Sequence, residues 1–399
     1  MRTLGSVTVV ALLTISAAAS YAQSVLATFD IGASELSAVE TNGCAAVDPI
    51  AGKHGGALKI ACQKGQTFFV KPRNRSVGFP GNLEYNLRIE SPPVSANVTF
   101  IYYALMGLTG EVTPDRRVRF VQFDPYDGTL MGEVRSAPLD SAYHTVVMLQ
   151  SATNRLFIDG AEVGNLPGLA SHPVADLATI GSHGCDANDC AQLGVQDAVI
   201  LDLDDLVARE DETVPSGPVS GGVMRPSACS TCTWTGAASR CPGCDTTVCK
   251  FCRGMCCQTQ AAHAVGAPPP PRDSKSQIVS RGPEALETFA HTSVVPSGQP
   301  VIATLLQARV RKTSIFADPA LVVQVGGLSF LTPCVVPPLR WSACNRLAGG
   351  AGRMDLVNPA TGVPWTTTDL DAASVGVQHT STRGGDSVTW ISWEVIYEE

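Results

Sequence analysis

A dense run of cysteines is the feature that most limits how this chain can fold. Eight of its fourteen cysteines lie between residues 229 and 257, with the spacing C-x2-C-x8-C-x2-C-x4-C-x2-C-x3-C-C. They are Cys229, Cys232, Cys241, Cys244, Cys249, Cys252, Cys256 and Cys257. The sizeable apolar side chains of this segment are only Trp234, Val248, Phe251 and Met255, too few for a hydrophobic core. Covalent or metal cross-links must therefore hold the segment together.

Zinc is one of two cross-links that the spacing predicts. Three successive C-x2-C pairs let single turns present both sulfurs to a tetrahedral ion, and eight thiolates would serve two sites, with His263 as an alternative ligand. The part from Cys229 to Cys252 resembles the cross-brace zinc fingers of the FYVE and RING type and the cysteine-rich tail of piggyBac-type transposases. It differs from those fingers at its end, where Cys256 and Cys257 are adjacent.

Disulfides are the other predicted cross-link, because the chain begins like an exported protein. Arg2 precedes an apolar run, and Ser20 and Ala22 stand before a cleavage point, so residues 1–22 are expected to be a secretory signal peptide. In an oxidising space, eight neighbouring thiols tend to become four disulfides. Spacing favours zinc and compartment favours disulfides, and both interpretations stay open. A redox role for the C-P-G-C at 241–244 is disfavoured, because nothing around it suggests the βαβ fold that activates such thiols.

The remaining six cysteines form local pairs. We expect disulfides between Cys44 and Cys62, between Cys185 and Cys190, and between Cys334 and Cys344, because each presumed domain then holds an even number. Two sequons, at Asn74 and Asn97, would carry glycans only in a eukaryotic host.

Charge and hydropathy argue against nucleic-acid binding and against a membrane-spanning protein. The formal net charge is -8 and the isoelectric point is near 5.4, which disfavours nucleic-acid binding because phosphate recognition needs a basic surface. The dense basic stretch at 115–120 alternates, which puts Arg117 and Arg119 on one solvent-facing side of a strand. No apolar run reaches the roughly 20 residues of a membrane span. We expect a secreted protein, extracellular or at the cell surface.

Two segments rich in proline, glycine and serine suggest the domain organisation. They predict linkers at 213–228 and 258–285, the second containing four consecutive prolines. The chain then divides into a first domain at 24–212, the cysteine module at 229–257 and a last domain at 286–399.

The first domain shows the strand and turn pattern of a β-sandwich. In RLFIDG at 155–160, Leu156 and Ile158 share a face, and Asp159-Gly160 supplies a turn with positive φ. This domain resembles the laminin-G and concanavalin-type jelly rolls. The matching elements are the opening strand VLATFD at 25–30, YHTVV at 143–147, RLFIDG, ATIGSHG at 178–184 and the final LDDLV at 203–207. The resemblance implies that the opening strand lies beside the last one.

Such folds serve both binding and catalysis. A retaining glycosidase needs two carboxylates about 5–5.5 Å apart, usually from alternate positions of one strand, and no such strand is present. The resemblance instead implies binding of a glycan or an extracellular protein. Calcium is not excluded, since turn-like segments carry Asp124, Asp127, Asp186 and Asp189, but each alone is typical of a turn and we assign no site.

The last domain also has the pattern of a β-sandwich. Residues 303–314 and 319–330 alternate like paired strands, TDLDAAS favours a short helix, and 386–399 is a strand. That last strand should place Val388, Trp390, Ser392 and Glu394 on one side. The domain resembles β-sandwich modules of phage and bacterial surface proteins. Most of its tryptophans are expected in the core or under a lid, and His291 and His379 at the surface.

The sequence thus predicts a mostly β chain with two sandwiches and a small cysteine-rich module between them. We expect a non-catalytic adhesion or recognition protein. Two alternatives remain, a structural component of a surface appendage or virion and a polysaccharide-active hydrolase.

Overall fold

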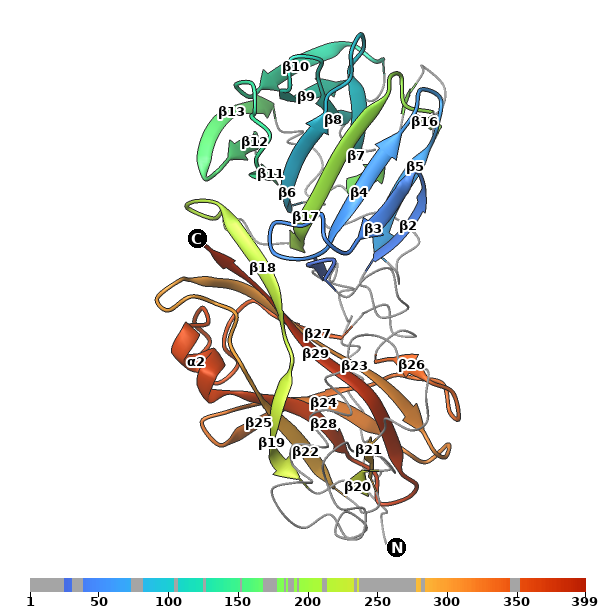
Figure 1. The fold of residues 1–399 in the computed structure, drawn as a ribbon, viewed down its shortest axis with the longest axis vertical. Coiled ribbons are helices and arrows are strands. Elements are labelled where there is room, and N and C mark those ends of the chain that lie inside the picture. Colours follow the sequence, from blue (N-terminus) through green and yellow to red (C-terminus); the bar gives the residue numbers. More distant parts are fainter. Residues whose placement is uncertain are drawn as a thin grey trace, which may run out of the picture.

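The structure is a computed structural model, and Figure 1 shows two β-sandwiches, one above the other. It describes residues 25–30, 39–72, 82–103, 107–124, 127–150, 153–167, 178–182, 184–185, 190–191, 194–209, 214–232, 235–236, 278–280, 284–344 and 352–399. Nearly all regular structure in these ranges is antiparallel strand, so the expected mostly β fold is confirmed. The expected signal peptide lies outside them.

The first sheet of the upper sandwich has the strand order β13-β12-β11-β6-β17-β4-β3, with β1 paired to β17. Its strands are β1 Val25–Ala27, β3 Ala45–Asp48, β4 Ala57–Cys62, β6 Asn82–Ser91, β11 His144–Leu149, β12 Thr153–Ile158, β13 Ala161–Pro167 and β17 Val199–Arg209. The opening strand therefore lies beside the last strand of this sandwich, as the sequence predicts.

The second sheet has the order β10-β9-β8-β7-β14-β5-β2. Its strands are β2 Val39–Gly43, β5 Phe68–Pro72, β7 Val98–Tyr103, β8 Leu108–Val112, β9 Val118–Phe123, β10 Leu130–Arg135 and β14 Ala178–Gly181. A separate short pair, β15 (Gly184–Cys185) and β16 (Cys190–Ala191), sets the backbones of Cys185 and Cys190 opposite each other.

The two sheets enclose one apolar core. Alternate residues of both sheets face it, and Tyr85 of the first sheet meets Phe100 of the second edge to face, with ring centroids 6.1 Å apart. The β12–β13 turn has the predicted geometry, since φ is 52° at Asp159 and 78° at Gly160.

The lower sandwich also contains two sheets. The third sheet has the order β20-β21-β29-β23-β26, with β18 on β29 and β27 on β23, and the fourth has the order β19-β22-β28-β24-β25. The third sheet contains β18 Val219–Met224, β20 Thr235–Gly236, β21 Ile278–Val279, β23 Val301–Lys312, β26 Ser342–Ala343, β27 Arg353–Asp355 and β29 Asp386–Glu398. The fourth contains β19 Pro226–Cys232, β22 Leu286–His291, β24 Pro319–Val325, β25 Leu328–Pro333 and β28 Ser374–His379. The expected short helix is α2, Thr367–Ala372, which begins with a capping box between Thr366 and Asp369.

Much of the segment expected as a linker at 213–228 is paired strand. β18 runs beside β29 from Val219, opposite Glu398, to Met224, opposite Trp393. β19 then pairs with β22 and carries Cys229 and Cys232, the first two cysteines of the expected module. The small residues that suggested a flexible linker here instead form a strand against which the neighbouring strands pack closely.

Two strands of the lower sandwich differ from the pairing expected of them. β23 pairs with β29, β26 and β27, whereas β24 pairs with β25 and β28, so the segments 303–314 and 319–330 lie in opposite sheets. A register shift between Arg309 and Val310 leaves Thr389 out of the alternation of β29. Val388 therefore packs in the core and not on the side of Trp390.

The core of the lower sandwich holds tryptophan and histidine side chains. Trp365 and Trp393 are fully buried and meet edge to face at 5.6 Å between centroids, which agrees with the expected core role. The expectation that His379 is a surface residue is wrong, because it is buried and its Nδ1 lies 2.6 Å from Oδ2 of Asp386. His291 is half-buried, but its ring packs against Trp393 with both nitrogens buried, and this loss of solvation lowers its pKa to about 4.

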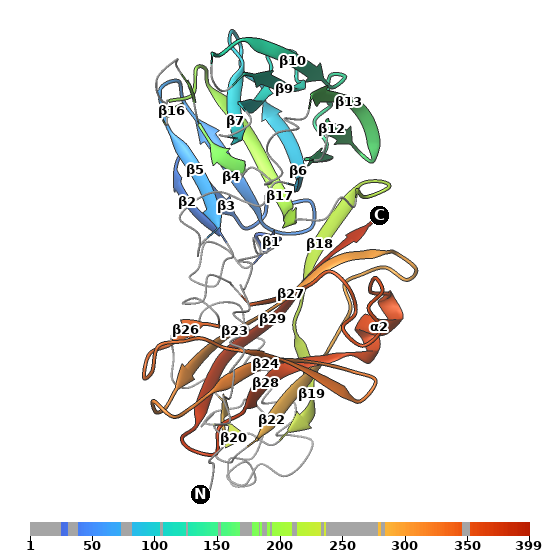
Figure 2. The same cartoon turned by 180° about the vertical axis from the view of Figure 1, so that it is seen from behind.

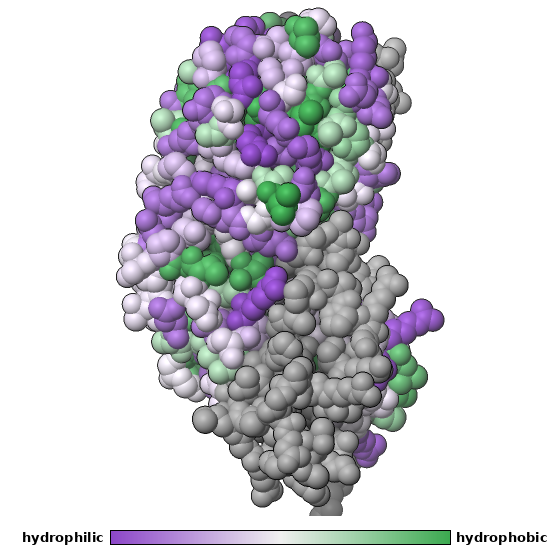
Figure 3. Space-filling model, viewed as in Figure 1, coloured by the Kyte–Doolittle hydropathy of each residue, from purple (hydrophilic) through white to green (hydrophobic). Residues whose placement is uncertain are grey.

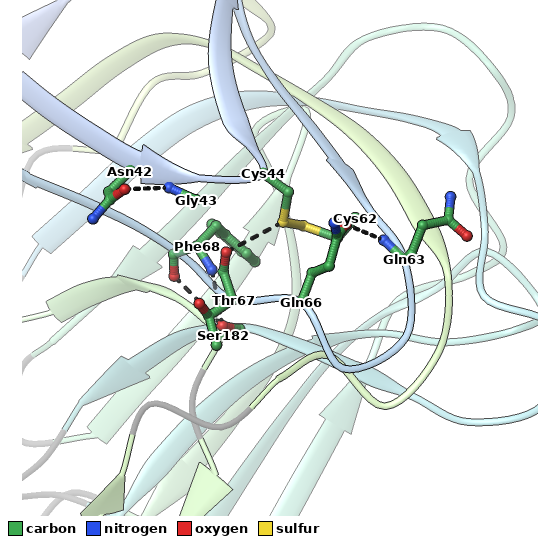
Figure 4. The surroundings of a disulfide bond; sticks show 9 residues. All are labelled: Asn42, Gly43, Cys44, Cys62, Gln63, Gln66, Thr67, Phe68 and Ser182. Atoms are coloured by element: carbon green, nitrogen blue, oxygen red, sulfur yellow. Dashed lines mark hydrogen bonds between the residues drawn. A yellow bond between two sulfur atoms is a disulfide. The ribbon is translucent and has the colours of Figure 1, made fainter.

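Two of the cysteine pairs named from the sequence are bonded in the structure. Cys44 joins Cys62, linking the β2–β3 turn to the end of β4 (Figure 4). Cys334 joins Cys344 in the lower sandwich. The six module cysteines from Cys241 to Cys257 lie outside the described residues, as do the sulfur positions of Cys185, Cys190, Cys229 and Cys232.

Among the described residues, no helix has the length and apolar character needed to cross a membrane.

Candidate functional site

A row of polar side chains crosses the outer face of the first sheet. The register sets Ala46 of β3 opposite Lys59 of β4, Lys59 opposite Asp202 of β17, and Asp202 opposite Arg88 of β6. Tyr143, directly before β11, completes the row, because its neighbour His144 is opposite Leu87. Since strand side chains alternate, the residues on either side of Lys59, Arg88 and Asp202 point into the core. Glu90 follows Arg88 by two residues on β6 and contacts Lys59, so it lies on the same face. We call Lys59, Arg88, Glu90, Tyr143 and Asp202 the stripe.

Arg88 is held at the centre of the stripe by three contacts. Its Nε and Nη2 each lie 2.9 Å from Oδ2 of Asp202, and its guanidinium stacks over the Tyr143 ring at 5.0 Å from the centroid. The Tyr143 hydroxyl donates to the carbonyl of Ala51 at 2.6 Å, which fixes the ring. The guanidinium is thus preorganised while the Arg88 side chain stays 30% exposed.

Asp202 lies beneath this guanidinium, fully buried. Its Oδ1 has no hydrogen-bond partner within the described part of the chain. Burial raises the pKa of Asp202, and the charge and hydrogen bond of Arg88 oppose the rise. Beside it, Lys59 Nζ contacts Oε2 of Glu90 at 2.5 Å, and this hydrogen bond raises the pKa of Lys59.

The stripe therefore offers fixed donors and acceptors with no net charge, since two cations face two carboxylates. Lys59 and Glu90 are partly open to solvent, like Arg88. Such an array can recognise a neutral, hydroxyl-rich ligand or a polar protein surface through hydrogen bonds and contact with an aromatic face. Each carboxylate is already bound to a cation, an arrangement that suits positioning better than proton transfer.

One row further along, the same face is closed by the lower sandwich. Val219 at the start of β18 donates its N–H to Thr145 Oγ1 at 2.9 Å, and its carbonyl accepts from Asn86 Nδ2 at 3.0 Å and from Lys53 Nζ at 3.0 Å. Asn86 Nδ2 also donates to Asp205 Oδ2 at 2.9 Å. Figures 1 and 2 show β18 and the end of β29 reaching the upper sandwich at this point.

Four carboxylates lie in this junction: those of Asp204, Asp205 and Glu394 are buried, and that of Asp30 is half-buried. Glu394 of β29 accepts from both N and Oγ1 of Thr28 at 3.0 and 2.8 Å, a direct link between the sandwiches. Burial raises the pKa of Asp30 to about 6, and those of Asp204 and Glu394 to about 7. Burial and the charge of Asp204 also raise the pKa of Asp205.

These raised pKa values make the junction sensitive to pH. Between the ordinary carboxyl pKa and about 7, the folded state binds more protons than the unfolded chain. These groups therefore stabilise the folded state fully below the ordinary carboxyl pKa, and the free energy of unfolding falls as the pH rises from there to about 7. The cations near the cluster, Lys53, His54 and Arg225, only partly offset the burial.

The other residues singled out from the sequence do not assemble into a site. Asp127 accepts from the backbone N–H of Thr129 at 2.8 Å, as a turn residue does, and Asp186 and Asp189 lie outside the described ranges. In those ranges no group of three or more histidine, cysteine, aspartate or glutamate side chains could hold a metal. Arg119 lies on a solvent-facing side, as expected, between Glu111 and Glu133.

Sequence reasoning missed the stripe. Its signal is the alternation of polar residues in NLRIE at 86–90 and of aspartate with leucine in LDLDD at 201–205. Because β6 and β17 are far apart in the sequence, neither pattern alone indicates that Arg88 and Asp202 meet.

Comparison with known proteins gives distant structural similarity only. No family model and no curated protein matches the chain. Among solved structures, the botulinum neurotoxin serotype D ligand-binding domain in complex with N-acetylneuraminic acid has a TM-score of 0.35 at 12% identity, covering 49% of this chain and 48% of that one. Carbohydrate-binding module CBM66 from Bacillus subtilis has a TM-score of 0.28 at 10% identity, covering 42% and 93%. The cellulose-induced protein Cip1 has 0.33 at 11%, covering 47% and 97%.

The similarity to the neurotoxin domains spans less than half of their length. At these TM-scores it assigns no function to this chain, and the architecture above rests on the strand pairing alone.

Proposed function

We propose that this chain is an exported, non-catalytic recognition protein whose laminin-G/concanavalin-like first sandwich binds a glycan or an extracellular protein. The observation that carries the proposal is the stripe. Four partly exposed side chains, those of Lys59, Arg88, Glu90 and Tyr143, are held next to one another above the buried Asp202 by their own contacts. Binding sites of this kind need preorganised groups and exposure together.

Paired charges favour a neutral, hydroxyl-rich ligand over a highly charged one. The Asp202–Arg88 and Glu90–Lys59 pairs leave the stripe with no excess positive charge that would attract an anionic ligand. A glycan can instead accept from the free guanidinium N–H groups, donate to carboxylate oxygens and lie along the exposed part of the Arg88–Tyr143 pair.

The proposal is tested by presenting the secreted full-length protein to a glycan array and to a panel of extracellular matrix proteins. We expect saturable binding to a subset of neutral glycans or to one protein class. Absence of binding in both formats would contradict it and favour the alternative of a structural component of a surface appendage or virion. Release of reducing sugar from a bound polysaccharide would favour the hydrolase alternative.

The cysteine module at 229–257 is proposed as a cross-linked element inserted beside the lower sandwich, since β19 carries its first two cysteines into the fourth sheet. Its cross-links are two zinc ions or four disulfides. Intact mass under native and denaturing conditions, with thiol alkylation, separates them. About 130 Da of bound metal together with eight alkylated thiols indicates zinc. A mass with no bound metal and no alkylated thiols indicates disulfides.

A further inference from the structure

A turn at one end of the lower sandwich carries two large apolar side chains. It follows β23, and the N–H of Ala317 donates to the carbonyl of Ser314 at 3.3 Å, which closes the turn. Its central residues are Ile315 and Phe316. Such positions usually hold glycine, asparagine, aspartate, serine or proline. Here Ile315 is 69% exposed and Phe316 is 56% exposed, so neither side chain contributes much to the core.

Two further loops lie beside this turn. Leu339 donates its N–H to the carbonyl of Lys312 at 3.0 Å, which joins its loop to the end of β23. Leu339 is 65% exposed and has a φ of 61°, a conformation that is uncommon for leucine. The loop before β29 is held here as well, because the N–H of Thr313 donates to the carbonyl of Gly385 at 2.8 Å. We call Ile315, Phe316 and Leu339 the apolar tip.

The loops at 313–318, 334–341 and 380–385, with the end of β23, are basic. Their cations include Arg311, Lys312, Arg340 and Arg383, of which the last two are exposed. Their single carboxylate is that of Asp318, which lies 3.1 Å from Nζ of Lys312. The Arg311 guanidinium stacks over the Trp341 ring at 5.0 Å from the centroid. In Figure 3, apolar residues in green lie next to hydrophilic residues in purple at the right-hand edge of the lower sandwich, where β23 ends in Figure 1.

We propose that the apolar tip and the cations around it form a peripheral docking surface for an anionic lipid bilayer. Large apolar side chains on an exposed turn can enter the headgroup region, while the neighbouring cations contact lipid phosphates. A bilayer accepts inserted side chains without a preformed cavity, whereas a protein partner would need a pocket that fits the turn. Exposed apolar residues flanked by cations therefore match a bilayer in both chemistry and shape.

The net charge of -8 does not prevent this contact, because the acidic junction is far from the apolar tip. Glu394 lies eight residues along β29 from Asp386, where the strand begins, a distance of about 26 Å. The Debye length in physiological salt is only about 8 Å. Asp386 itself is buried against His379. The charges of the three loops therefore dominate the potential that a bilayer meets at the tip.

The experiment measures co-sedimentation of the full-length protein with vesicles. One set is phosphatidylcholine alone, and the other contains about a quarter phosphatidylserine. We expect binding to the second set, weak binding to the first, and release when sodium chloride is raised from about 0.1 to about 0.5 M. Ile315→Ser/Phe316→Ser should weaken binding at least about tenfold, because it removes the apolar area that enters the bilayer. Arg340→Gln/Arg383→Gln should weaken it at least about fivefold.

Val94→Ser/Leu130→Ser is the matched control. It removes two apolar side chains from the upper sandwich, which are 85% and 55% exposed, and should bind vesicles like the wild type. Circular dichroism verifies that each variant is folded. The proposal is overturned if the wild type binds neither set, binds both sets equally, or binds as before in Ile315→Ser/Phe316→Ser. Because the apolar tip and the stripe lie in different sandwiches, such a result leaves the proposed ligand binding untouched.

Discussion

Two neighbouring regions on one face of the first sheet use the same residue types in opposite ways. In the stripe, Asp202 is buried beneath a partly exposed arginine, and each carboxylate faces a cation. One row away, at the junction, Asp204 and Asp205 are covered by the lower sandwich and bound largely by backbone amides and Asn86. The comparison shows that what covers a row of polar residues, more than its composition, decides between a surface that can bind and a structural contact.

The largest expected loss of stability comes from adding a methyl group where β18 packs against the first sheet at the junction. A Cβ on Gly221 would lie 2.0 Å from Oδ1 of Asp205. Gly221→Ala should therefore push β18 away from the first sheet and lower the free energy of unfolding by about 2–3 kcal/mol, measured by urea denaturation. Gly217→Ala is the control, because nothing lies within 4 Å of its Cβ position. Equal stability of the two variants would mean that β18 does not pack tightly against Asp205 at Gly221.

A smaller effect should follow from pH. Because burial raises the pKa of Glu394 to about 7, the wild-type free energy of unfolding should fall by about 1–3 kcal/mol from pH 5 to pH 8. Glu394→Gln keeps an oxygen for Thr28 and removes the titration, so its pH dependence should be weaker. Urea midpoints at both pH values provide the measurement. If the free energy of unfolding of Glu394→Gln depends on pH as strongly as that of the wild type, the titrating group is not Glu394.

The smallest effect on stability is expected at the stripe. The double variant Arg88→Met/Asp202→Asn removes the ion pair without leaving a buried charge, and methionine keeps apolar contact with Tyr143. Arg88 is partly exposed but Asp202 is fully buried, so the amide that replaces its carboxylate is left without a partner, and the loss should be about 1–2 kcal/mol by thermal unfolding. A loss as large as that of Gly221→Ala would show that the stripe is structural.

The sequence predicts local features of this fold better than distant ones. The Asp159-Gly160 turn follows from residues that are adjacent in the chain, and its geometry could be predicted. β18 could not, because glycine and serine favour a linker while its partner β29 lies near the other end of the sequence. Burial of His379 was missed for a related reason: the partner, Asp386, is close in sequence but joined to it by a turn between two strands in different sheets.

The site shows the same limit. Lys59, Arg88 and Asp202 come from three strands, and only the register of the sheet makes them neighbours. The module cysteines were easier to find, because their spacing is local, but spacing alone leaves zinc and disulfides equally open.

Calorimetric titration of an array-selected ligand tests the stripe most directly. The wild-type protein is compared with Arg88→Met/Asp202→Asn and with Arg155→Met/Glu162→Gln, which changes another arginine that is stacked on an aromatic ring, Phe157, and paired with a carboxylate on the same sheet. We predict that the first double variant loses affinity by at least about tenfold, or 1.4 kcal/mol, while the second binds like wild type. Equal affinity in all three proteins would contradict the assignment of the stripe as the binding site.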